Sequence, residues 1–187
     1  ATGSRRSWAL KLDFVDCRPD VKPESLEESP TLISYFRGKK SEWKTGIRAS
    51  NKIVYRELWP GIDLVYSGTV NKMKYEFLVK PGADPSKIRL AYRGADNVDL
   101  NGEGQLEFAT PLGGFSDDAP VAWQGDGKER KDVAVSYKLG KKTGNGSREY
   151  GFTIGEYDRS QTLVLDPAVL VYCGYIGGSV DDIASGV

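Results

Sequence analysis

Short stretches in which apolar and polar residues alternate recur along the chain, and most end at glycine or proline. In the first stretch, residues 8–14, every second residue is apolar. Side chains of a strand point alternately to opposite faces, so this period of two predicts a β-strand with one buried and one solvated face. The same pattern recurs in residues 53–55, 73–79, 88–92 and 133–139.

Turn residues separate these stretches, as at Pro60-Gly61, Asn101-Gly102 and Asp126-Gly127. Such pairs favour tight turns between strands. No window of a dozen residues carries the apolar stripe of an amphipathic helix without glycine or proline, so we expect one helical turn at most, in residues 23–28, which is equally compatible with a loop. The sequence predicts an all-β fold, an antiparallel β-sandwich-like or barrel-like domain with very little helix.

The composition excludes several classes of function. The 187 residues include 26 basic and 26 acidic side chains and no basic stripe with interleaved aromatic residues, so we expect no nucleic-acid partner. No apolar run approaches the ~20 residues of a membrane-spanning helix, so we expect no membrane span. Histidine is absent, which removes catalytic triads that require it and the commonest transition-metal ligand.

The two cysteines, Cys17 and Cys173, lie near opposite ends of the chain. A disulfide between them would close a very long loop and so restrict the unfolded chain. Two buried thiols that act as small apolar side chains explain the same residues equally well, because a single pair gives no spacing pattern.

A candidate binding surface lies in the segment from Trp59 to Asp63. An exposed Trp offers a large contact area for a glycan or a peptide. The structural interpretation is favoured, because Pro60-Gly61 has the residue order of a type II turn and Asp63 would accept backbone N–H groups beside it. The binding residues that we nominate are Trp59, Asp63, Tyr66 and Trp123.

Paired carboxylates are the remaining candidate catalytic groups, since a glycosidase needs two acids and no histidine. The best pairs are Asp63 with Glu76 and Asp158 with Asp166. Acids at turns more often cap the backbone or remain solvated, so we expect no enzyme activity and keep a glycoside hydrolase only as the third alternative.

Oxygen-rich turns at residues 99–103, 117–118 and 181–182 are candidates for a calcium-binding site. None has the full alternating ligand loop with a distal Glu, and a hairpin turn explains Asn101-Gly102 without metal. Asn145-Gly146-Ser147 is formally a glycosylation sequon, although Asn-Gly also signals a hairpin. We expect neither a metal nor a cofactor.

Longer motifs follow one another along the chain, in residues 58–68, 74–85, 102–106, 119–124, 155–167 and 175–178. In their residues and their order, these motifs resemble the domain that precedes SBBP-type β-propeller repeats in bacterial secreted proteins.

The resemblance implies a domain organisation and a setting. Residues 1–7 are expected to be a flexible end or an artificial extension, residues 8–166 the pre-propeller domain, and residues 167–187 the start of a truncated propeller repeat. The function implied is a non-catalytic structural or interaction module of a secreted or cell-surface protein that caps or presents a propeller. The alternative is an extracellular module that binds a glycan or a protein.

The family resemblance also implies further sequence upstream of Trp8 and a full propeller downstream. We therefore expect at least one strand edge that pairs with an absent segment. The remainder of the parent polypeptide, another copy or a complementing chain would occupy it by strand addition. The strand that begins at Trp8 and residues 168–176 are the expected edges.

Overall fold

The computed structural model describes residues 8–69, 72–142 and 148–170, and within them all regular structure is strand or short 3-10 helix. Three 3-10 turns, η1 (Lys40–Glu42), η2 (Pro85–Lys87) and η3 (Gly127–Glu129), connect strands. The strands are β1 (Lys11–Phe14), β2 (Glu24–Tyr35), β3 (Lys44–Trp59), β4 (Ile62–Thr69), β5 (Lys72–Val79), β6 (Leu90–Arg93), β7 (Asn97–Leu100), β8 (Leu106–Thr110), β9 (Gly113–Asp117), β10 (Val121–Gln124), β11 (Lys131–Val133), β12 (Val135–Lys142), β13 (Arg148–Ile154) and β14 (Leu163–Leu170).

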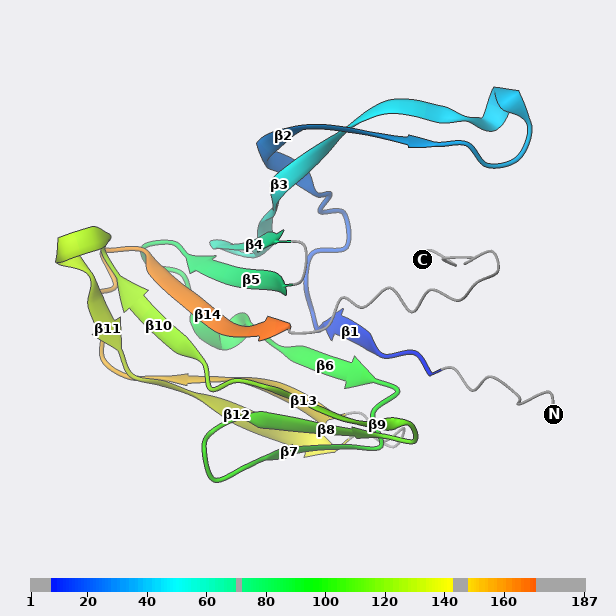
Figure 1. Cartoon of the computed structure of the whole chain (residues 1–187). Coiled ribbons are helices and arrows are strands. Elements are labelled where there is room, and N and C mark those ends of the chain that lie inside the picture. The colour runs from blue at the N-terminus through cyan, green and yellow to red at the C-terminus, as the bar shows by residue number, and fades with distance from the viewer. Residues whose placement is uncertain (1–7, 70–71, 143–147, 171–187) are drawn as a thin grey trace.

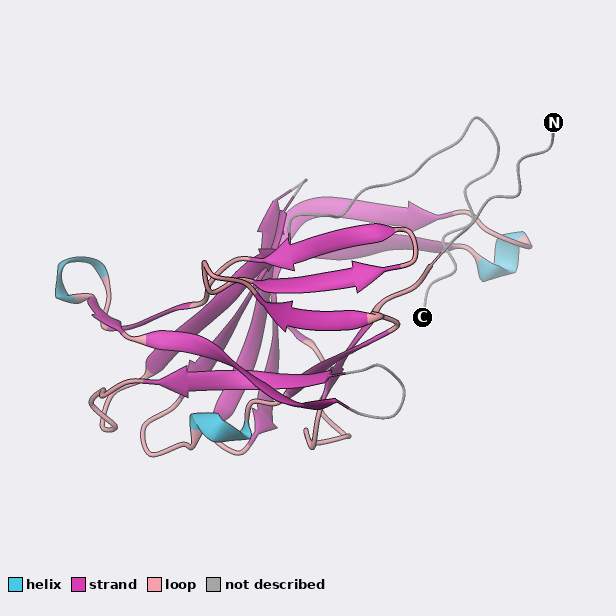
Figure 2. Cartoon of the chain, turned by 90° about the horizontal axis from the view of Figure 1, so that it is seen from below, coloured by secondary structure: helices cyan, strands magenta, loops and turns pink. Residues whose placement is uncertain are grey.

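These strands form three antiparallel sheets (Figure 1). The largest has the order β11-β10-β14-β5-β4-β3-β2, the second has the order β1-β6-β13-β12, and the third is β7-β8-β9. Aromatic side chains fill the space between the sheets. Figure 2 shows the sheets from below. The all-β sandwich-like fold is therefore confirmed.

The core joins strands that are far apart in the sequence. Phe77 of β5 packs against Phe152 of β13, with ring centroids 6.2 Å apart. Tyr92 of β6 packs edge-on against Phe108 of β8 at 4.5 Å. Such aromatic contacts bury large apolar areas. The first holds the seven-stranded sheet against the four-stranded sheet, and the second holds the four-stranded sheet against the three-stranded sheet.

One local expectation is wrong, because residues 23–28 form no helical turn. Strand β2 begins at Glu24, which lies opposite Val54 of β3. Backbone pairing with β3 overrides the weak helix-start signal of a proline followed by acids.

The last described strand, β14, contains a proline. It continues past Asp166 to Leu170, and residues 168–170 pair with β5 alone. Pro167 lies where the pairing with β5 shifts register, and the pairing with β10 stops at Asp166. A residue without an N–H is tolerated there because the regular ladder is interrupted.

A long hairpin projects from this body (Figure 1). It consists of β2, the η1 turn and the first part of β3, and we call residues 24–52 the arm. Beyond it β3 enters the body, where Val54, Leu58 and Trp59 are buried. The arm is a two-stranded ribbon, because β3 pairs with β4 only from Lys52 onward and β2 is the last strand of its sheet.

Candidate functional site

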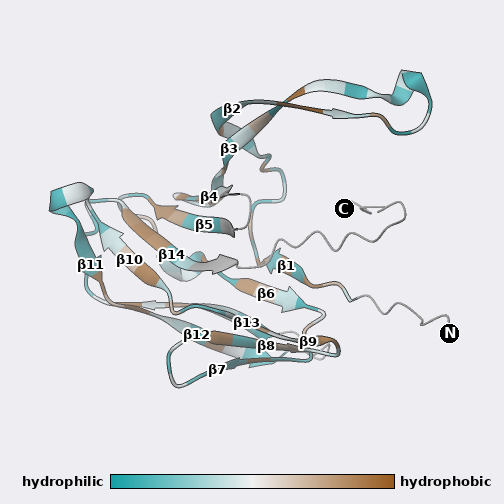
Figure 3. Ribbon diagram, in the orientation of Figure 1, coloured by the Kyte–Doolittle hydropathy of each residue, from teal (hydrophilic) through white to brown (hydrophobic). Residues whose placement is uncertain are grey.

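The arm exposes large apolar side chains. Leu32 is 61% exposed, Tyr35 59% and Phe36 65%. Leu26, Ile33, Trp43 and Ile47 are also exposed, and Figure 3 shows hydrophobic residues in both strands. Isolated two-stranded ribbons are marginally stable in water, and contiguous apolar surface commonly marks a contact site. This makes the arm the strongest candidate interaction element in the described chain.

The arm joins the body through residues 24–30 of β2 and 48–56 of β3, which we call the stem and which differ from the far end of the arm. Charged side chains there pair across the two strands, and Pro30 together with several register shifts interrupts the free edge of β2. Charges, proline and bulges are devices that protect an edge against strand addition. The ion pairs are Arg56–Glu24 at 2.9 Å, Lys52–Glu27 at 3.4 Å and Arg48–Glu28 at 3.8 Å.

The nominated residues Trp59 and Asp63 lie inside the body. Trp59 is 2% exposed, and its indole N–H donates to the carbonyl oxygen of Val15 at 3.0 Å. The carboxylate of Asp63 is buried and accepts the backbone N–H of Glu57 at 2.8 Å. Both residues therefore stabilise the turn and its surroundings, as the structural interpretation predicts.

A small ionic network completes that turn. Glu57, which has a positive φ of 53°, accepts the N–H of Gly61 at 2.7 Å and the ammonium group of Lys80. The hydrogen bond from Lys80 lowers the pKa of Glu57, and the acceptors Glu57 and Asp63 raise the pKa of Lys80. Every polar group in this network has a local partner, so the network is structural.

Tyr66 lines an apolar hollow of about 480 Å³ at the base of the arm. Burial raises the pKa of Tyr66 to about 12. The wall includes Phe14, Cys17 and Tyr55, and Arg18 is its one charged residue, so no carboxylate among the described residues lines this hollow. It therefore lacks the paired acids that glycoside hydrolysis requires.

Trp123, the fourth nominated binding residue, lies on β10 and is half-buried. The guanidinium carbon of Arg130 lies 4.1 Å from the centre of its ring. The cation thus covers one face of the ring.

The predicted carboxylate pairs have separate surroundings. Asp158 is exposed and accepts the N–H of Ser160 at 2.9 Å, whereas Asp166 is buried and pairs with Lys74. Lys74 also reaches Glu76 at 3.7 Å, so the lysine brings Glu76 and Asp166 together. Within the described residues, Asp63 shares no ion-pair or hydrogen-bond partner with Glu76, and Asp158 shares none with Asp166.

The oxygen-rich turns have local explanations within the described residues. The side chain of Asn101 accepts the N–H groups of Glu103 and Gln105, both at 3.0 Å, and so closes the β7–β8 hairpin. No group of three or more acidic or cysteine ligands that could hold a metal occurs in the described part of the chain. Asp181, Asp182, the Asn145 sequon and Cys173 lie outside the described residues.

Asp117 is a buried acid, although nothing in the sequence distinguishes it from its exposed neighbour Asp118. Neither carboxylate oxygen has a hydrogen-bond partner within the described residues, and the same holds for the hydroxyl groups of Tyr75 and Tyr150. Burial, with a smaller contribution from the charge of Asp118, raises the pKa of Asp117 to about 7.

Comparison with known proteins gives a family but no activity. A family described as "Domain of unknown function (DUF7948)" matches residues 1–168. The chain belongs to this family. No curated protein and no solved structure matches the chain. Within the described residues, no helix has the length and apolar character needed to cross a bilayer.

Proposed function

We propose that this member of the DUF7948 family is a non-catalytic interaction module that contacts its partner through the arm. One observation carries the proposal: the far end of the arm exposes aromatic and aliphatic side chains away from the body. The sandwich has a continuous core, so it is suited to serve as a rigid mount.

The setting that we propose comes from the family resemblance. The module belongs to a secreted or cell-surface bacterial protein and caps or presents an SBBP-type β-propeller. The body would then face the propeller, and the arm would face another molecule.

Side chains at the end of the arm are better placed to make this contact than the free edge of β2. Charged residues and Pro30 protect the stem of that edge. The two edges expected from the sequence are short. Strand β1 is an edge strand of four residues, and in the described part of β14 residues 168–170 pair with β5 alone.

Site-specific photo-crosslinking tests the proposal whatever the identity of the partner. A benzophenone amino acid replaces Phe36 on the arm or, as a matched control, Leu112, which is 52% exposed in the turn between β8 and β9. The parent protein carrying either residue is irradiated on the cells that make it. We expect adducts of defined mass only from position 36. Equal labelling at the two positions, or no adduct at position 36, would reject the arm as the binding element.

A further inference from the structure

The end of the arm combines aromatic side chains with positive charge. We call residues 35–44 the tip. The tip has the aromatic residues Tyr35, Phe36 and Trp43, and it has four basic residues against the single acid Glu42, a formal charge of +3. The whole chain has no net charge, so this concentration is local.

The positive charges of the tip are available to a ligand. Glu42 is occupied within the turn, where its carboxylate accepts the backbone N–H of Lys39 at 2.9 Å. Within the described chain, none of the four basic side chains of the tip forms an ion pair, in contrast to those of the stem. They are Arg37, Lys39, Lys40 and Lys44.

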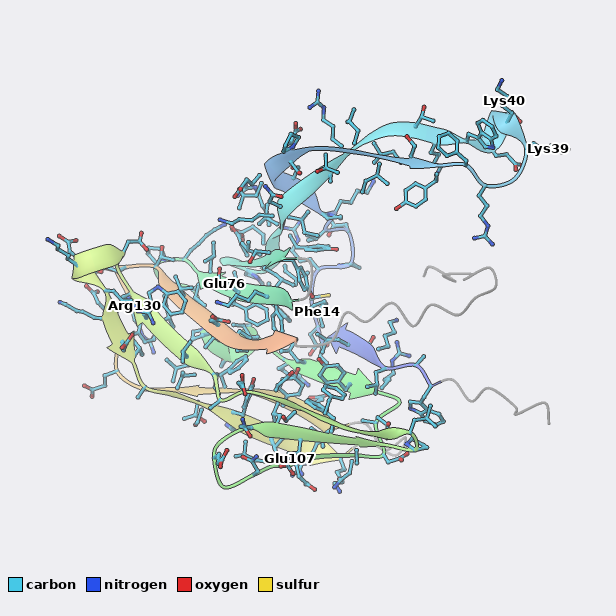
Figure 4. All side chains as sticks on the ribbon, in the orientation of Figure 1. Phe14, Lys39, Lys40, Glu76, Glu107 and Arg130 are labelled. Atoms are coloured by element: carbon cyan, nitrogen blue, oxygen red, sulfur yellow. The ribbon has the colours of Figure 1, made fainter. Side chains whose placement is uncertain are left out.

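The aromatic side chains form a convex end rather than a pocket. The rings of Phe36 and Trp43 pack edge to face with their centres 5.1 Å apart. Lys39 and Lys40 lie at the far end of the arm, remote from the body (Figure 4). A convex end cannot enclose a small ligand, so it must enter a concave partner or a deformable medium.

Apolar side chains on both faces of the ribbon favour the deformable medium. Leu32 and Ile33 are consecutive in β2, lie opposite Arg48 and Ile47, and so point to opposite faces. Both are exposed. A protein groove would cover mainly one face, whereas the interfacial region of a bilayer surrounds an inserted ribbon.

We propose that the tip inserts into the surface of an anionic lipid bilayer. Aromatic rings settle at the level of the headgroups, and lysine and arginine stems lie along apolar surface while their charges reach lipid phosphates. Basic residues beside an anionic leaflet add to the attraction. This inference rests on the proposed function, because it names the partner that the arm contacts.

Flotation of the full chain with lipid vesicles tests the inference. Vesicles of phosphatidylcholine alone are compared with vesicles that also contain phosphatidylglycerol. We expect at least roughly tenfold stronger binding to the anionic vesicles, weakened by high salt. Lys39→Glu/Lys40→Glu should remove this preference, and Phe36→Ser/Trp43→Ser should remove binding to the anionic vesicles.

A matched variant, Lys128→Glu/Lys131→Glu, makes the same charge change beside the exposed η3 turn of the body and should bind like the unaltered chain. Thermal unfolding verifies that all variants remain folded. Absence of binding to anionic vesicles, or an equal loss in the body variant, overturns the inference. If position 36 crosslinks only to protein and vesicles do not bind, the membrane proposal fails while the interaction module stands; failure of both experiments rejects both.

Discussion

Replacement of Asp117 by Asn should stabilise the protein much more at alkaline pH than at acidic pH. Asp117 is fully buried, and its pKa is about 7 in the folded protein against an ordinary value of 3.8. Between these values the folded protein holds a proton that the unfolded chain has released. Stability therefore falls as the pH rises through this window.

The size of the effect follows from the two pKa values. A tenfold difference in proton affinity corresponds to about 1.4 kcal/mol, so complete passage through the window costs about 4 kcal/mol. Asn carries no charge at any pH and avoids this cost. About 4 kcal/mol of this cost is present at about pH 8 and about 1 kcal/mol at about pH 4.5, so we expect the stability of Asp117→Asn relative to the unaltered chain to be about 3 kcal/mol greater at the higher pH.

Urea denaturation followed by tryptophan fluorescence at the two pH values measures this difference. The charge of Asp117 also affects Tyr75, Tyr92 and Tyr137, but burial keeps the pKa values of these tyrosines well above this pH range. A buried amide adds only an offset that is independent of pH. Asp118→Asn is the matched control, because it makes the same chemical change at the exposed neighbouring residue. If the effect of Asp117→Asn is the same at both pH values, Asp117 is ionised in the folded protein and the reasoning is wrong.

Two further predictions concern the turn and the cysteines. Gly61→Ala should cost about 3 kcal/mol in urea denaturation, because φ is +73° and the new Cβ would lie 2.6 Å from the Cβ of Ala83. Gly82→Ala, with φ of +76° and open space, should cost about 1 kcal/mol; equal losses would exclude the contact as the cause. If Cys17 and Cys173 are paired, alkylation of the denatured chain without a reduction step should leave its mass unchanged, and two alkylated thiols would contradict the bond.

Strands with one buried face were predictable from the sequence. In β5, Tyr75, Phe77 and Val79 are buried, and the residues between them are only partly buried, so the period of two survives in the sequence. The Pro60-Gly61 turn was predictable for a similar reason, because its backbone geometry depends on local residue types. Gly61 has the positive φ that a type II turn requires.

Features that depend on tertiary packing were not predictable. Both faces of the arm are solvated, so β2 carries no alternation, and its proline and acids resemble a helix start. The pair Asp117-Asp118 gives no local sign that one acid is buried and the other exposed. The nominated Trp59 and Asp63 lie at a turn by sequence but inside the core by packing.

The arm should be dispensable for folding, which would show that its apolar residues serve another purpose. Glu28 of β2 lies directly opposite Ser50 of β3, so an Asn-Gly pair could replace residues 29–49 and close a shorter hairpin. None of the removed residues belongs to the buried core. We expect the free energy of unfolding to change by less than about 1 kcal/mol in urea denaturation. A large loss of stability would instead mean that the exposed apolar residues support the body, and the main argument for a binding arm would fall.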